Sequence, residues 1–180
     1  KGRNRYVITP RFAISCSTEQ LIAAGRLHEQ YPGTYIQTHL SENKDEIDST
    51  LSLCPDCQDY LEVYERARLV TDRSIFGHCI HLSDSECRRL VEAGSVVAHC
   101  PTSNLFLGSG LFDMQQANRV GMQTVLATDI GAGTSFSMLR TMGEAYKVQQ
   151  LGGYPMSVFE SLYKCTLGLS LIHISEPTRP

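Results

Sequence analysis

The sequence predicts an α/β fold, namely a partial (β/α)8 barrel of the TIM type with about five βα units. Short runs rich in β-branched and aromatic residues alternate with helical stretches, the layout of parallel strands joined by helices. This alternation alone would also fit a doubly wound sheet. His39, His78, His99 and Asp129 each lie at the end of such a run. They favour the barrel, whose catalytic groups come from the carboxyl ends of successive strands and meet at one mouth.

Five strands are expected, because each run is rich in Val, Ile, Thr, Tyr or Phe and is bounded by polar or glycine-containing segments. The expected strands are Arg5–Thr9, Tyr35–Leu40, Ser74–Cys79, Ser95–Cys100 and Gln123–Thr128.

Helices are expected between these strands, and two of them begin with a recognisable capping box. Ser17 is followed three residues later by Gln20, and Ser83 by Glu86, so that each pair can satisfy two free N–H groups of the first helical turn. The helices placed individually run from Ser17 toward Gly33, from Ser83 to Gly94, and from about Phe136 to Leu151.

Composition restricts the class of partner. The chain has 180 residues, 42% of them hydrophobic, and a net charge of −3, as in an ordinary globular protein. We expect no membrane span and no signal peptide, and therefore a cytoplasmic protein. There is no basic run that would favour nucleic acid, so we expect a small-molecule ligand.

The chain has seven cysteines, and two of them form the pair Cys54-x-x-Cys57. The second pair typical of a zinc ribbon does not follow it, so we do not interpret this pair as a metal site.

Neither end of the chain has the pattern of a natural domain boundary. The chain begins with Lys1 and enters a strand-like run almost at once, so we expect residues 1–168 to be a truncated barrel. Residues 169–180 resemble translated adapter sequence from library preparation, and we interpret them as a non-native tail.

Histidine and carboxylate at strand ends suit a divalent metal ion such as zinc, which lowers the pKa of bound water and generates hydroxide near neutral pH. Glu42 follows His39 by three residues, where a carboxylate could accept the proton of that water. Because His-x-x-Glu occurs often by chance, the pattern alone leaves open whether these are catalytic or structural side chains.

Five motifs together carry a resemblance to a known family. They are Pro10-Arg11-Phe12, Thr38-His39-Leu40-Ser41-Glu42-Asn43, Gly77-His78, His99-Cys100-Pro101-Thr102-Ser103-Asn104-Leu105 and Thr128-Asp129-Ile130-Gly131-Ala132-Gly133-Thr134-Ser135-Phe136-Ser137-Met138. From about Tyr6 to Gly168 the chain resembles the guanine deaminases of the amidohydrolase superfamily, especially the bacterial ones. The first and last motifs are the most particular to these enzymes.

The resemblance implies hydrolysis of guanine to xanthine and ammonia at a zinc site. His39 and Asp129 would be metal ligands and Glu42 the proton shuttle, with His78 and Asp129 as further catalytic groups. Arg11 and Phe12 would bind the purine, which would also touch His39, Glu42 and Asp129. The His-x-His metal pair of the family's first strand does not occur in this chain. The resemblance also implies that the protein forms a homodimer.

Two alternative functions remain at this point: another metal-dependent aromatic deaminase or chlorohydrolase on the same barrel, or a non-catalytic relative.

Several other residues receive structural interpretations. We expect His99 to hydrogen-bond backbone, His28 and His81 to lie at the surface, and Ser103 and Asn104 to close a turn. Gly131 and Gly133 would provide flexibility beside Asp129, and Tyr146 would pack in the core with Leu139, Met142 and Gly143.

Overall fold

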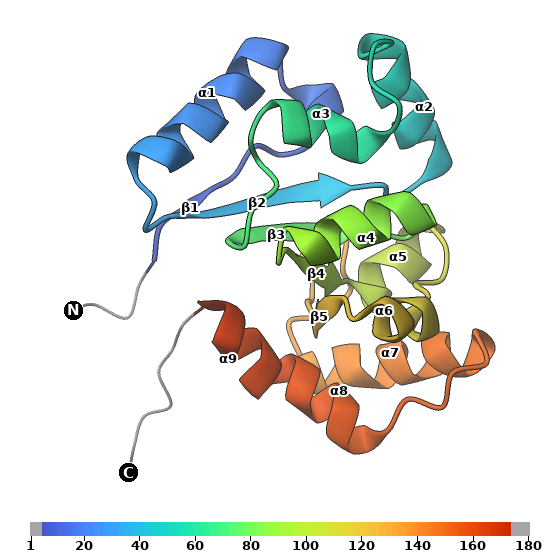
Figure 1. Cartoon of the computed structure of the whole chain (residues 1–180). Helices are drawn as coiled ribbons and strands as arrows, with labels where there is room; N and C mark the ends of the chain where they lie inside the picture. Colours follow the sequence, from blue (N-terminus) through green and yellow to red (C-terminus); the bar gives the residue numbers. More distant parts are fainter. Residues whose placement is uncertain (1–4, 174–180) are drawn as a thin grey trace.

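The computed structural model describes residues 5–173, and the side chains of residues 5–170. Its centre is a five-stranded parallel sheet in the order β1-β2-β3-β4-β5 (Figure 1). The strands are β1 (Val7–Ile8), β2 (Tyr35–Leu40), β3 (Ser74–His78), β4 (Val96–His99) and β5 (Gln123–Leu126). All five expected strands are confirmed, although four are shorter than predicted.

The strand order decides between the two architectures that alternation had left open. Each strand pairs with its predecessor in the chain, from Val7 opposite Tyr35 in β1 and β2 to His99 opposite Leu126 in β4 and β5. A doubly wound sheet would reverse its order at a switch point, whereas a barrel adds strands in sequence. The described sheet is therefore an arc of a barrel.

The predicted capping boxes are present. The side chains of Ser17 and Ser83 accept hydrogen bonds from the backbone N–H groups of Gln20 and Glu86, respectively. A third box, which the sequence analysis did not identify, opens a further helix at Asn43. In the described residues a 3-10 turn covers Ala13–Ser15, and the helices are α1 (Thr18–Gln30), α2 (Lys44–Leu53), α3 (Tyr60–Arg66), α4 (Asp84–Glu92), α5 (Pro101–Leu107), α6 (Met114–Val120), α7 (Met138–Leu151), α8 (Val158–Cys165) and α9 (Leu167–His173).

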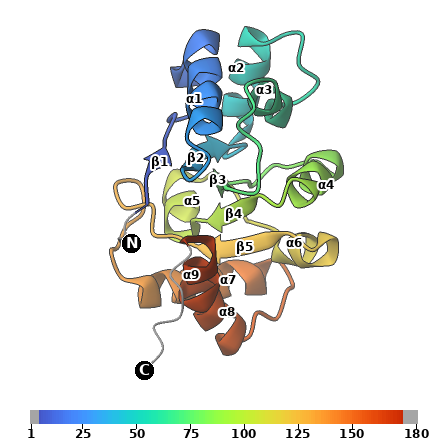
Figure 2. The same cartoon turned by 60° about the vertical axis from the view of Figure 1, so that its left-hand side comes forward.

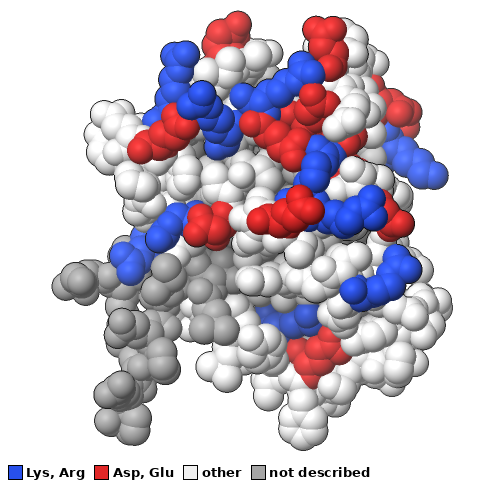
Figure 3. Space-filling view, in the orientation of Figure 1, with Lys and Arg blue, Asp and Glu red and all other residues white. Residues whose placement is uncertain are grey.

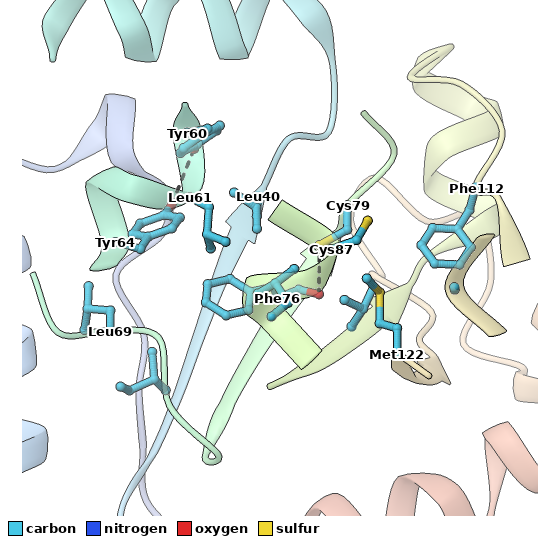
Figure 4. Packing of buried hydrophobic residues seen from close by; sticks show 14 of the residues in the cluster. Leu40, Tyr60, Leu61, Tyr64, Leu69, Phe76, Cys79, Cys87, Phe112 and Met122 are labelled. Atoms are coloured by element: carbon cyan, nitrogen blue, oxygen red, sulfur yellow. Dashed lines mark hydrogen bonds between the residues drawn. The ribbon is translucent and has the colours of Figure 1, made fainter. Parts of the chain in front are cut away.

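The main core lies between the sheet and the helices. From the strands it receives Ile36, Leu40 and Phe76. The Phe76 ring packs against that of Tyr64 from α3, with centroids 5.9 Å apart (Figure 4). Alternate strand residues point to the opposite face. There a smaller cluster contains Ile75, Val96, Ala98 and Val125, with Leu169 of α9 partly buried against it. Residues of β3 and β4 are buried on both faces of the sheet, as expected for parallel strands.

The carboxyl-terminal helices gather beside β5. Figure 2 shows α7, α8 and α9 next to this strand, and each of the three contacts it. Helix α9 crosses the boundary that we expected after residue 168, and residues 174–180 of the expected tail lie outside the described residues. That residues 169–180 are non-native stays a prediction.

Two structural interpretations of helical side chains were wrong. His28 is buried, because it lies on the inner side of α1 and its Nδ1 is 3.1 Å from the Thr34 hydroxyl. Tyr146 and Leu139 are exposed, since α7 turns Thr141, Ala145 and Val148 toward the core instead.

Basic and acidic side chains are interspersed on the face shown in Figure 3, so this face offers no continuous positive surface for a phosphate backbone. In residues 5–173 no helix has the length and hydropathy needed to cross a membrane.

Candidate active site

Three side chains from different strand ends meet at the carboxyl edge of the sheet. His39 is the second-last residue of β2, His78 ends β3 and Asp129 follows β5. Each offers one ligand atom within 4.8 Å of the others. Among the residues that the structure describes, this is the one such group of histidine, cysteine and carboxylate side chains. The predicted convergence of these three residues is confirmed, and the Cys54/Cys57 pair forms no comparable group.

The backbone is strained at this edge. His78 and Asp129 have φ values of 71° and 46°, in the left-handed region that non-glycine residues rarely adopt. Simple strand alternation would place His78 with Phe76, facing the helices. Instead its ring stacks on that of His39, with centroids 5.1 Å apart. The left-handed backbone thus redirects His78 toward the mouth, and such strain is characteristic of functional sites.

A backbone carbonyl fixes the proton position on His39. Its Nδ1 lies 2.6 Å from the Arg11 carbonyl oxygen, which can only accept a hydrogen bond. Nδ1 therefore carries the proton, and the lone pair of Nε2 is free. A metal-binding histidine commonly has this arrangement, in which a backbone carbonyl accepts from one ring nitrogen and leaves the other free for the ion. With the Asp129 carboxylate, His39 provides the nitrogen and oxygen donors that suit a divalent ion such as zinc.

His78 has a partner of the opposite kind. The Asn104 side-chain Nδ2 lies 3.0 Å from His78 Nδ1 and donates to it. The other ring nitrogen, Nε2, is 4.0 Å from the Asp129 carboxylate. Burial, together with the neighbouring His39, lowers the pKa of His78 to about 4. The ring is therefore neutral near pH 7.

Glu42 lies beside His78 at the same mouth. Its Oε1 is 3.7 Å from His78 Nδ1 and accepts a 3.0 Å hydrogen bond from the Ser109 hydroxyl. The Glu42 backbone N–H donates to the Glu46 carboxylate at 2.8 Å. Glu42 is thus held at both its backbone and its side chain, close to the three-residue group.

The Arg11–Phe12 segment lies against the same strand end. The Arg11 carbonyl also accepts hydrogen bonds from the His39 N–H and the Thr38 hydroxyl, both at 3.2 Å. The Phe12 ring is 5.6 Å from the His39 ring, and the Arg11 guanidinium lies 5.1 Å above the Phe12 ring. The structure therefore brings both expected purine-binding residues to the mouth.

A buried tyrosine pair that the sequence analysis missed supports this arrangement. Tyr64 donates to the His39 carbonyl at 2.8 Å and accepts from the Ala13 N–H at 3.0 Å. Tyr60 donates to the buried Glu46 carboxylate at 2.8 Å. Burial raises the pKa of both phenols, so they remain protonated donors. Their spacing of four residues on one helix was a signal for a shared buried face.

His99 does not take part in the site. It is completely buried on the helix side of β4, where its ring stacks on Phe112 with centroids 4.8 Å apart. Neither ring nitrogen has a hydrogen-bond partner in the described residues, so the expected backbone hydrogen bond is wrong. Burial lowers the pKa of His99 to about 3, which keeps the ring neutral.

Three further expectations about loops need correction. Ser103 and Asn104 do not close a turn but lie buried in α5. Gly133 permits a close approach rather than flexibility, because a Cβ there would lie 1.7 Å from the Thr128 carbonyl oxygen. His81, expected at the surface, is partly buried and its Nε2 lies 2.8 Å from the Ser109 carbonyl oxygen.

Comparison with known proteins identifies the family. The profile of the amidohydrolase family matches residues 1–169. The chain belongs to the amidohydrolase family. It is 52% identical to guanine deaminase of Escherichia coli over 93% of this chain and 38% of that protein. It therefore spans less than half the length of this relative.

Several solved structures share the fold. The E. coli guanine deaminase structure superposes with a TM-score of 0.92 at 50% identity, covering 94% of this chain and 40% of that one. A guanine deaminase from C. acetobutylicum with bound guanine gives 0.87 at 35% identity, covering 93% and 42%. A zinc-bound adenosine deaminase from Xanthomonas campestris, at 23% identity and a TM-score of 0.83, shares the fold alone, covering 90% and 37%. The partial barrel is thereby confirmed.

Proposed function

We propose that the protein to which this chain belongs is a guanine deaminase, which converts guanine and water to xanthine and ammonia. The observation that carries the proposal is the position of the Arg11–Phe12 segment against His39. The Arg11 carbonyl accepts a hydrogen bond from His39 Nδ1, and the Phe12 ring lies 5.6 Å from the His39 ring. One segment therefore orients the expected metal ligand and brings the expected purine-binding residues beside it. The 52% identity to a guanine deaminase supports this choice of substrate.

His39 and Asp129 would hold zinc, and we infer that the remaining ligands lie outside this chain. When bound, the ion supplies Lewis-acid activation of water. Glu42 accepts a proton as the water oxygen forms its bond to C2 of guanine. It then returns the proton to the amino nitrogen, and the C2–N bond breaks to release ammonia. His78 directs Nε2–H toward the oxygen that accumulates negative charge.

Arg11 and Phe12 would select the purine. The planar guanidinium of Arg11 offers several N–H donors in a fixed geometry, which suits the carbonyl oxygen of guanine. Phe12 would lie against the flat base. Neither group is needed for activating water, so they would control binding rather than the chemical step.

The test is a chimera in which residues 6–168 replace the matching segment of E. coli guanine deaminase. We expect the purified chimera to bind zinc and to release ammonia from guanine. Glu42→Gln should retain zinc but lose about 10²- to 10⁴-fold in kcat, because the amide cannot transfer the proton. Glu29→Gln, an exposed carboxylate on α1, is the matched control and should be unaffected.

A folded, zinc-loaded chimera that releases ammonia only from other aminated heterocycles, or chloride from a chlorinated triazine, would replace guanine with that substrate. A zinc-loaded chimera without activity on any of them would contradict the proposal of an enzyme.

A further inference from the structure

We propose that Asn104 is a positioning residue that fixes His78 as the tautomer with its proton on Nε2. The inference rests on the proposed function, because it assigns His78 a hydrogen-bond donor directed at the reacting oxygen. It concerns a residue of α5, outside the strand ends that carry the expected catalytic groups.

The direction of the hydrogen bond carries the argument. A side-chain amide nitrogen can only donate, so the 3.0 Å contact from Asn104 Nδ2 requires a lone pair on His78 Nδ1. A neutral imidazole with a lone pair on Nδ1 carries its proton on Nε2. That nitrogen lies on the side of Asp129, whose carboxylate is 4.0 Å away.

Because both partners are buried, this hydrogen bond determines the tautomer of His78. His78 is 2% exposed and Asn104 is 1% exposed, so bulk water cannot substitute for either partner. The Asn104 oxygen Oδ1 has no hydrogen-bond partner in the described residues. The one side-chain hydrogen bond that the structure gives Asn104 therefore goes to His78. An amide buried only to stabilise α5 would be expected to use its oxygen as well.

The end of α5 also contacts Glu42, the proposed proton shuttle. The Asn104 carbonyl accepts a hydrogen bond from the Ser109 N–H at 2.9 Å, and the Ser109 hydroxyl donates to Glu42 at 3.0 Å. The segment from Asn104 to Ser109 thus contacts both His78 and Glu42. It therefore links the positions of these two side chains.

Two substitutions in the zinc-loaded chimera test the inference. Asn104→Leu removes the donor at similar volume, and Asn104→Asp presents only acceptor oxygens, which should move the proton from Nε2 to Nδ1. We expect kcat for guanine to fall about 10- to 100-fold in both, the usual effect of losing a hydrogen bond that orients a side chain of a metal site. KM and zinc content should change little. Ser103→Ala, a buried neighbour on α5 whose hydroxyl has no partner in the described residues, is the control and should retain activity.

Nitrogen-15 NMR of histidine-labelled chimera provides a readout that activity does not. The His78 signals, assigned by their loss in His78→Gln, should show a protonated Nε2 and an unprotonated Nδ1. Asn104→Asp should reverse this pattern, and Asn104→Leu should give a mixture. A proton on Nδ1 in the unsubstituted protein, or unchanged tautomer and kcat in a folded Asn104→Leu variant, would overturn the inference. Failure of the proposed function is distinct, since the unsubstituted chimera would then not deaminate guanine while the NMR result would still stand.

Discussion

Removing the Tyr64 hydroxyl should weaken both the fold and the site. Its hydrogen bonds join α3 to the end of β2 and to the Arg11–Phe12 segment, through the His39 carbonyl at 2.8 Å and the Ala13 N–H at 3.0 Å. A buried hydrogen bond contributes about 0.5–1.5 kcal/mol net. The Thr38 hydroxyl, at 3.0 Å, would lose a partner as well, whereas Ala13 N–H would keep the Tyr60 hydroxyl at 3.3 Å. We therefore expect Tyr64→Phe to cost about 2 kcal/mol of unfolding free energy.

Urea unfolding of the 180-residue chain measures this cost, with the slope checked for a change in the denatured state. The control is Tyr31→Phe, whose side chain is exposed and which should lie within about 0.5 kcal/mol of the parent chain. In the chimera, Tyr64→Phe should also lower zinc affinity, because the strand end that carries His39 loses its support. Equal unfolding free energies for Tyr64→Phe and Tyr31→Phe would refute the reasoning.

Three further outcomes are expected. The chain alone should bind Zn²⁺ far more weakly in isothermal titration calorimetry than the chimera does, and tight binding would show that our proposed ligand set is incomplete. Since burial lowers the pKa of His99 to about 3 and an unfolded histidine titrates near 6.5, stability should fall as pH drops below about 6.5, by up to about 1.4 kcal/mol per pH unit for this group. His99→Leu should make that dependence shallower in urea unfolding at pH 7 and pH 5, and an unchanged slope would argue against a buried neutral ring. Gly133→Ala should destabilise by about 1–3 kcal/mol, since its Cβ would collide with the Thr128 carbonyl. Gly143→Ala, which meets nothing within 4 Å inside α7, should be neutral or stabilising in thermal unfolding, and similar effects at the two positions would contradict the packing argument.

The strands could be predicted because their information is local. A parallel strand that is buried on both faces is usually a run of mainly apolar residues, as Val96, Val97 and Ala98 are in β4. The helix starts at Ser17 and Ser83 were equally local, since a capping box needs only four residues. The order of the strands in the sheet depends on contacts between distant segments, so it could be established only from the strand pairing in the structure.

The convergence of His39, His78 and Asp129 was predictable, because parallel strands end at one edge. The direction in which each strand-end side chain points was only partly predictable. Alternation from Val97 in the main core correctly sends His99 to the helix side, a signal that the sequence analysis did not use. For His78 the same rule fails, because its left-handed backbone departs from strand geometry.

The hydrogen-bonding partners of the two histidines explain why spacing cannot assign their roles. His39 and His78 stack 5.1 Å apart beside one carboxylate, so residue type and position make them nearly equivalent. Their difference comes from residues 28 and 26 positions away, since Arg11 contributes an acceptor and Asn104 a donor. The contact with Arg11 leaves a lone pair on Nε2 of His39, and the contact with Asn104 leaves an N–H on Nε2 of His78. The same type of side chain can therefore offer either a lone pair to a cation or an N–H to an oxygen, depending on the partner that the fold brings to its other ring nitrogen.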